Sequence, residues 1–352
     1  MKSRHAEITE DLRGRIRGGE FDPGTTLPTI RELAETYETS YFTVQTALKP
    51  LEAEGLVERR RRVGTVVSPN IGLLTRVAVY CGHEFIDEPQ YAFARELCGQ
   101  LQRQCAEAGI ETRLFTDTRP EAEQGEPLPE LKDAVAQHQV QGIVVPLCGR
   151  DSRRSLEALN LPIAFVHGGE PNGVGFSTRQ LIDLSLGRLR DVGCTTVGLV
   201  SPDLGVTSIE GDRHTIGDLF VEKAAALGLG TDDDWVDVRK VDGRGHEAFG
   251  YDAMTTLWQR EARPEGLLVY PDTVARGVTM AILEQGIRVP DDLKLIFHHN
   301  TGIEWPCPPA VDWVVTDVAQ WAAEMIAIVQ RQVKGKPVEP VVLEYELRES
   351  GR

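Results

Sequence analysis

The sequence lacks the features that would place it in or across a membrane. No run of about 18 or more apolar residues is present, which is the length a spanning helix needs. The first residues, MKSRHAEITEDLRGR, contain no apolar stretch of the kind found in a secretory signal. We therefore expect no membrane association and a cytoplasmic protein.

Cysteine and histidine are sparse, and their spacing matches no metal or disulfide pattern. The six cysteines include no CxxC pair and no close pair, so we expect free thiols in a reducing compartment. His298 and His299 are adjacent, but no third ligand accompanies them in the sequence. No metal site is predicted.

Motifs of common enzymes are missing as well. There is no GxGxxG after a strand, no GxxxxGK[ST] phosphate loop, no GxSxG elbow and no HExxH. A body resembling pyridoxal-phosphate aminotransferases is an alternative for a chain with a DNA-binding head. It is disfavoured because no lysine follows a strand where a Schiff base would form. We predict neither an enzyme nor a cofactor.

Charge is distributed unevenly along the 352 residues. Residues 1–70 hold 11 Lys+Arg and 11 Asp+Glu, whereas the remainder holds 27 against 43 and so carries the whole net charge of −16. A neutral head on an acidic body is compatible with one DNA-contacting module, because the acidic body is repelled by phosphates. An acidic enzyme with an N-terminal appendage would show the same balance.

Three short helices and a hairpin are predicted in the first seventy residues. Residues 4–17 repeat apolar side chains every four residues and stop at Gly18 and Gly19. Thr29, with glutamate three residues later, predicts the capping box of a second helix, and SYFTVQTALKPLEAEGL predicts the third. Two short strands then flank a tip at Val63 and Gly64. This is the pattern of a winged helix-turn-helix.

The run LPTIRELAETYETSYFTVQTALKPLEAEGLVERRRRVGTVV resembles the GntR-family DNA-binding domain over about residues 5–68. In a winged helix-turn-helix the third helix is expected to fit the major groove of DNA, and the basic hairpin to lie along the backbone or reach into the minor groove. Family contacts with DNA fall here at Thr29, Arg31, Ser40, Thr43 and Gly64. The wing adds four candidate phosphate contacts, Arg59, Arg60, Arg61 and Arg62.

The third helix departs from the family pattern at two positions. Where the family usually has arginine, this sequence has Tyr41 and Gln45. Glutamine pairs with adenine, whereas arginine prefers guanine, so we expect both residues to contact bases and the operator to differ from the common family sequence. Pro50 is also unusual inside a helix, because it removes a backbone donor and should kink the helix.

Short apolar runs alternate with helical stretches from residue 76 onwards. This alternation predicts doubly wound parallel sheets, and the order of elements predicts two α/β lobes around a cleft. The expected strands are 76–82, 112–116, 142–147, 162–168, 195–201, 235–241, 266–271, 293–299, 311–317 and 341–349.

The segment YPDTVARGVTMAILEQGIRVPDDLKLI is similar to LacI-type sensor domains and periplasmic sugar-binding proteins. The resemblance covers about residues 75–350 and implies that Asp272 and Arg213 line the cleft and hydrogen-bond the effector. A carboxylate can accept two hydroxyl groups and a guanidinium can donate two bonds, which suits a sugar or polyol.

Other cleft candidates are less specific. Trp305, Tyr91 and Phe85 are aromatic residues that can stack on a ligand, and His167 and Asp317 stand at predicted strand ends; each can equally be an ordinary packing or rim residue. FHHNTG at 297–302 and GFST at 175–178 depart from the family's cleft loops. The effector can therefore differ from the common sugars.

A GntR-type head on a LacI-type body is the arrangement of arabinose-repressor-like regulators, and this chain resembles that subfamily. The expected domains are 1–69 for the head, 70–75 for a linker and 76–352 for the effector-binding and dimerisation domain. We expect a homodimeric repressor of a palindromic operator in double-stranded DNA, modulated by a small sugar or polyol. An activator, a non-sugar effector and a solute-binding protein are the alternatives.

Overall fold

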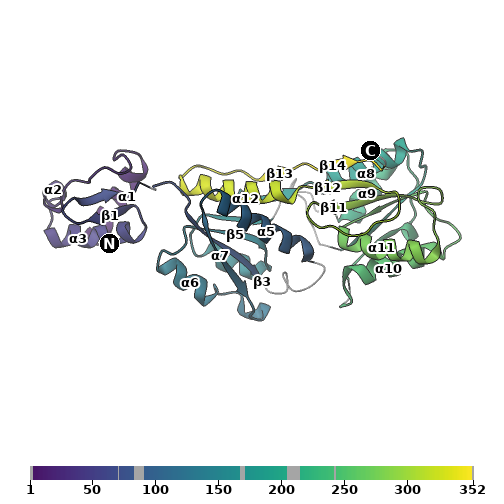
Figure 1. Cartoon of the computed structure of the whole chain (residues 1–352), viewed down its shortest axis with the longest axis horizontal. Coiled ribbons are helices and arrows are strands. Elements are labelled where there is room, and N and C mark those ends of the chain that lie inside the picture. The colour runs from purple at the N-terminus through teal and green to yellow at the C-terminus, as the bar shows by residue number, and fades with distance from the viewer. Residues whose placement is uncertain are drawn as a thin grey trace. The chain divides into compact units, whose positions relative to one another are not determined.

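The computed structural model describes residues 3–69, 71–82, 91–166, 171–203, 215–241 and 243–350. The chain divides into two compact units, one of residues 1–80, 105–164 and 326–338 and one of the remainder. Described strands form one two-stranded and two six-stranded sheets (Figure 1). The α/β architecture with an N-terminal winged head is thus confirmed. The predicted domain boundaries remain predictions.

The head consists of three helices and a hairpin, as predicted. Its elements are α1 (Arg4–Arg17), α2 (Ile30–Thr36), α3 (Tyr41–Ala53), β1 (Val57–Arg60) and β2 (Gly64–Val67). One apolar core holds them together, and its members include Ile8, Leu12, Ile16, Leu33, Val44, Leu48, Leu51 and Val67. Inward residues of α3 recur every three or four positions, so the opposite side of the helix remains available to a partner.

Local chemistry explains where the head's helices start. The Thr29 hydroxyl accepts the Glu32 N–H while the Glu32 carboxylate accepts the Thr29 N–H, which is the predicted capping box. The Ser40 hydroxyl caps α3 by accepting the N–H of Thr43 at 3.1 Å. Helix α3 runs through Pro50 as one element.

The first six-stranded sheet has the order β13-β7-β6-β5-β3-β4. Its strands are β3 (Arg76–Gly82), β4 (Glu111–Asp117), β5 (Gly142–Leu147), β6 (Ile163–Val166), β7 (Gly173–Phe176) and β13 (Val341–Leu343). Helices α5 (Ala92–Glu107), α6 (Pro129–Ala136) and α7 (Arg150–Glu157) follow strands of this sheet, together with the short turn η2 (Glu121–Glu123). Helix α12 (Val318–Val333) comes later in the chain and hydrogen-bonds to β6 and β7 through Gln332 and Trp321. Strand β7 was not predicted.

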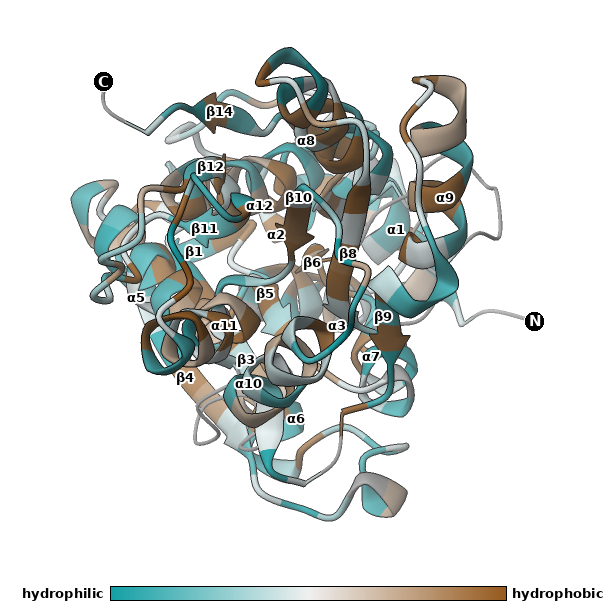
Figure 2. Ribbon diagram, turned by 90° about the vertical axis from the view of Figure 1, so that its right-hand side faces the viewer, coloured by the Kyte–Doolittle hydropathy of each residue, from teal (hydrophilic) through white to brown (hydrophobic). Residues whose placement is uncertain are grey.

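The second six-stranded sheet has the order β14-β12-β11-β10-β8-β9. Its strands are β8 (Val197–Pro202), β9 (Val236–Arg239), β10 (Gly266–Val269), β11 (Lys294–Asn300), β12 (Asp312–Thr316) and β14 (Glu346–Arg348). Its helices are α8 (Thr178–Asp191), α9 (Ile216–Ala226), α10 (Gly245–Trp258) and α11 (Asp272–Gln285), with the turn η3 (Asp233–Trp235). The central strand β10 is buried throughout and apolar (Figure 2).

The prediction of one closing strand over 341–349 was wrong. Strand β13 pairs in parallel with β7, whereas β14 pairs antiparallel with β12 of the other sheet. Between them, the Tyr345 N–H donates to the Gln180 Oε1 at 3.0 Å instead of to a neighbouring strand. The ladder therefore stops at Tyr345, and the two halves of the segment close different sheets.

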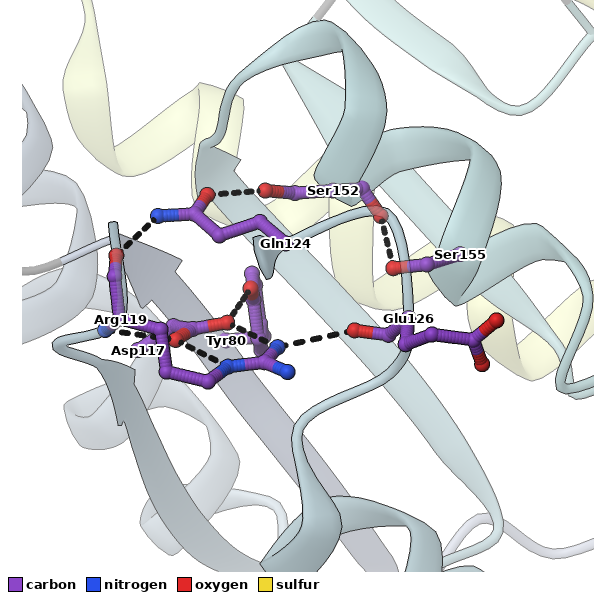
Figure 3. A network of polar contacts seen from close by, with 7 residues as sticks. All are labelled: Tyr80, Asp117, Arg119, Gln124, Glu126, Ser152 and Ser155. Carbon is purple, nitrogen blue, oxygen red and sulfur yellow. Dashed lines mark hydrogen bonds and ion pairs between the residues drawn. The ribbon is translucent and has the colours of Figure 1, made fainter. Parts of the chain in front are cut away.

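A buried polar network lies where β3 and β4 of the first sheet end (Figure 3). The Asp117 side chain is 0% exposed and accepts the Tyr80 hydroxyl at 2.6 Å and the Arg119 guanidinium at 2.7 and 2.9 Å. Arg119 also donates to the Glu126 carbonyl at 2.9 Å. Burial alone raises the pKa of Asp117, but the hydrogen bonds from Arg119 and Tyr80 outweigh it and hold that pKa below its usual range.

We expect Asp117→Asn to cost about 2 kcal/mol of folding free energy at pH 7, the scale of hydrogen bonds to a charged group. A carboxylate with a lowered pKa stabilises the fold above its unfolded pKa of about 3.9 and loses that contribution as pH falls further. The deficit of the variant should therefore shrink below about pH 4, measured by urea denaturation. The exposed Asp133→Asn is the control, and a deficit independent of pH would contradict the assignment.

Candidate nucleic-acid interface and effector site

The outward side of α3 presents the two residues that replace the family's arginines. Tyr41 is 50% exposed and Gln45 is half-buried, one turn further along the helix. No described residue hydrogen-bonds the Gln45 amide or the Tyr41 hydroxyl. Both side chains therefore keep their bonding capacity for an external partner, as base readout requires.

Three predicted DNA contacts also take part in hydrogen bonds that stabilise the starts of α2 and α3, namely Thr29, Ser40 and Thr43. The Thr29 and Ser40 hydroxyls cap α2 and α3, and the Thr43 hydroxyl lies 2.8 Å from the Ser40 hydroxyl. Each cap takes up the N–H of the third residue of its helix, and the N–H groups of the first two residues remain at the helix end, where they can meet a phosphate. Arg31 follows on the exposed surface of α2, without an ion pair to any described residue.

The wing carries four arginines in two kinds of setting. Arg59 pairs with Glu52 at 3.4 Å and Arg60 pairs with Glu58 at 3.1 Å. Arg61 and Arg62 are exposed at the turn and bind no acidic side chain within the described residues. Gly64 begins β2 with φ +117°, a conformation that L side chains rarely adopt. The tip of the wing therefore presents two exposed arginines, Arg61 and Arg62, that have no acidic partner among the described residues.

Two head substitutions should separate base readout from backbone binding. Gln45→Ala should relax preference at one or two base pairs and cost about 1–3 kcal/mol, because only the base contact is lost. Arg61→Ala should weaken binding to all sequences alike, as removal of a phosphate contact does. Selection of bound sites from a random DNA pool measures both. An unchanged preference for Gln45→Ala would show that α3 docks differently.

The second sheet brings polar side chains together where its strands end. Asp272 begins α11 directly after β10 and is 2% exposed. Its Oδ2 accepts the backbone N–H and the side-chain N–H of Asn300 at 3.4 and 3.1 Å. Among the described residues, nothing donates to Oδ1. A buried carboxylate with one open oxygen can accept a hydroxyl or an amine of a ligand.

Aromatic and imidazole rings lie beside this carboxylate. His298 is 3% exposed, its Nε2 is 2.5 Å from the Thr316 hydroxyl, and its Nδ1 lacks a partner in the described part of the chain. Burial lowers the pKa of His298 to about 4, so the ring is neutral at pH 7. Its ring contacts Tyr270 and Tyr345 with centroids 4.7 and 6.0 Å apart.

Both tyrosines favour the neutral phenol. Burial raises the pKa of Tyr270 to about 12 and raises that of Tyr345. We call Tyr270, Asp272, His298, Asn300, Thr316 and Tyr345 the second-sheet polar cluster. It combines one buried carboxylate with neutral donors and ring faces, which is the chemistry that binds polyhydroxylated molecules.

In this sheet the first strand, β8, lies between the second and the third, β9 and β10. Ligands of open parallel sheets bind outside the carboxyl ends of the strands at such a reversal. Asp272 follows β10 and Asn300 ends β11, so the cluster occupies this edge. The sequence did not predict Asn300, His298 or Tyr345 as effector contacts. It showed only that the segment FHHNTG, residues 297–302, departs from the family pattern.

Of the other predicted effector residues, three lie in the described part of the chain and three lie outside it. Trp305 stacks on Phe297 and meets Trp313 with centroids 6.3 and 5.9 Å apart, and Asp317 caps α12 by accepting the N–H groups of residues 319 and 320. Tyr91 is half-buried at the start of α5. Phe85, His167 and Arg213 lie outside the described residues, so their predicted roles remain predictions.

Two further properties concern only the described ranges. No three His, Cys, Asp or Glu side chains converge there as metal ligands. None of the helices in those ranges has the length and apolar character needed to cross a membrane.

A winged helix-turn-helix joined to two parallel sheets defines a class of architecture found in bacterial regulators. Residues 4–67 match the family described as "Bacterial regulatory proteins, gntR family", and residues 186–350 match the "Periplasmic binding protein-like domain". The chain therefore combines a GntR-type head with a periplasmic-binding-protein-like body. The family expectation drawn from the motifs is confirmed.

Two transcription regulators are each similar to part of this chain. The transcriptional repressor PurR of Pasteurella multocida is 24% identical over 221 residues, which are 58% of this chain and 61% of PurR. An uncharacterized HTH-type transcriptional regulator of Streptomyces coelicolor is 48% identical over 61 residues, 17% of this chain and 23% of the relative. The chain thus spans less than two thirds of either relative. Both are named as transcription regulators, not enzymes.

Solved structures share the fold at low identity. The complex of the transcriptional regulator CelR with cellobiose aligns with a TM-score of 0.60 and 19% identity, covering 92% of this chain and all of that one. The regulator CcpA of Lactococcus lactis aligns with a TM-score of 0.59 and 19% identity, covering 79% and 100%. These similarities establish the fold alone.

Proposed function

We propose that this chain is a ligand-responsive transcription regulator, and that it represses its target genes from a palindromic operator. The observation that carries the proposal is the combination of two kinds of surface on one chain. One is the outward side of α3 with the wing arginines, and the other is the second-sheet polar cluster. The proposal places the protein in the cytoplasm, where its DNA partner is found.

The effector that suits the polar cluster best is a small sugar or polyol. Asp272 offers acceptors, Asn300 offers an amide, and the tyrosine rings offer apolar faces for C–H groups. The relatives support this class, since CelR was solved with cellobiose and a regulator of Arthrobacter sp. with lactose. A non-sugar effector is the alternative, because His298 and His299 stand where the family usually has acidic residues.

We further propose a homodimer, since a two-fold axis would place two heads on the two halves of an inverted repeat. Helix α11 supports the proposal with two exposed apolar side chains, Met280 and Leu283, which are 58% and 54% exposed. They are three residues apart and therefore neighbours on the helix surface. Apolar side chains placed together in this way are typical of association surfaces.

A two-stage assay tests the function. Sugars and polyols are first screened for a rise in melting temperature, since a ligand that binds the folded state stabilises it. Compounds that raise it are then added to the protein on operator DNA. We expect at least one compound to change operator affinity by about 5–150-fold, the usual range of allosteric coupling. Stabilisation without any change in DNA affinity would contradict a sensor role.

A further inference from the structure

The first two turns of α3 are unusual in their chemistry. Residues 41–48, YFTVQTAL, include no charged side chain. Phe42 is 74% exposed, more than any other exposed large hydrophobic residue of the described chain, and no ring contact involves it. An aromatic side chain left this open loses the free energy that its burial would provide, about 25 cal/mol per Å² of apolar surface.

The position of Phe42 on the helix shows what it can meet. Val44, Ala47, Leu48 and Leu51 turn inward and are at most 1% exposed. Phe42 precedes Gln45 by three residues, so the two side chains are neighbours on the outward face. Because Gln45 is a predicted base contact, Phe42 lies on the face that would enter the major groove.

The major groove offers one apolar group to such a side chain, the C5-methyl group of thymine. An arginine would select guanine through its O6 and N7, but no arginine lies in these two turns. The amide of Gln45 suits the N6 and N7 of adenine. Both chemistries therefore favour A·T pairs.

We propose that Phe42 reads the C5-methyl group of a thymine in each operator half-site. This inference rests on the proposed function, because it requires that α3 docks in the major groove. Phe42 then determines specificity through apolar contact, beside the hydrogen bonds of Gln45. The preferred half-site holds a thymine within about one base pair of the adenine that Gln45 contacts, since residues 42 and 45 are one turn apart.

Deoxyuridine tests the proposal because it differs from thymidine only by the missing methyl group. The full chain is first used to select an operator from random DNA, and each thymine of the half-site is then replaced by deoxyuridine, symmetrically in both halves. A buried methyl contributes about 0.8 kcal/mol, about fourfold in affinity, so two half-sites give about 15-fold. We expect this loss at one position and little elsewhere.

Phe42→Ala should bind the thymine and the deoxyuridine operators equally at that position, with the affinity that the wild type has for deoxyuridine. Phe42→Leu is the matched variant that keeps an apolar contact and should retain part of the discrimination. Because the ring is exposed, neither change should alter the melting temperature. A wild type indifferent to every methyl, or a Phe42→Ala variant that still discriminates, would overturn the proposal. Failure to select any operator would instead refute the proposed function.

Discussion

Raising the salt concentration from 50 to 200 mM is expected to weaken operator binding by about 10³–10⁵-fold. A protein that neutralises six to ten phosphates releases their counterions, and the free energy of that release falls as salt rises. We predict that exposed cations of α2, α3 and the wing supply such contacts, namely Arg31, Lys49, Arg59, Arg60, Arg61 and Arg62. Titration of labelled operator at several salt concentrations measures the slope.

The double variant Arg61→Ala, Arg62→Ala provides the control for this result. These two cations lack ion pairs with described residues, so their loss should flatten the salt slope without unfolding the head. Binding of an uncharged sugar by the same protein should be nearly independent of salt. Operator affinity that ignored salt would mean that the wing does not lie against the DNA backbone.

The second large effect is expected at the effector site. Asp272→Asn keeps the size of the side chain but exchanges one acceptor oxygen for a donor. A bound hydroxyl then loses its partner or meets a second donor, at a cost of about 1–3 kcal/mol. The apparent affinity for the effector should fall about ten- to hundredfold, measured by the ligand concentration that halves operator occupancy.

Operator binding without effector should remain near the wild-type level, because Asp272 begins α11 and lies outside the head. Asp291→Asn is the matched control, since this carboxylate is exposed. If Asp272→Asn abolished DNA binding while the effector still raised its melting temperature as in the wild type, the carboxylate would serve the fold through Asn300. The effector site would then lie elsewhere.

The head could be predicted almost completely because its signals are local. Thr29 and Glu32 specify a capping box over four residues, and the four-residue apolar period of α1 identifies its buried face. The sequence did not reveal Phe42, because its importance depends on which side of α3 the core covers. That becomes visible only when the helices pack.

The body was predicted less completely because its decisive contacts join distant residues. Strand β7 was missed because Gly173 and Gly175 reduce the β-branched signal that identifies buried strands. Residues 341–349 look like one strand, yet pairing with two sheets divides them. The bond from Asn300 to Asp272 spans 28 positions, and no local pattern predicts it.

The most direct test of a dimeric, ligand-responsive repressor is a nuclease footprint of the full chain on genomic DNA fragments that bind to it. We predict two protected half-sites related by two-fold symmetry, with centres one or more helical turns of about 10.5 base pairs apart. A sugar or polyol that raises the melting temperature should weaken this protection. Protection without an inverted repeat, or a footprint that no stabilising ligand alters, would contradict a dimeric, ligand-responsive repressor.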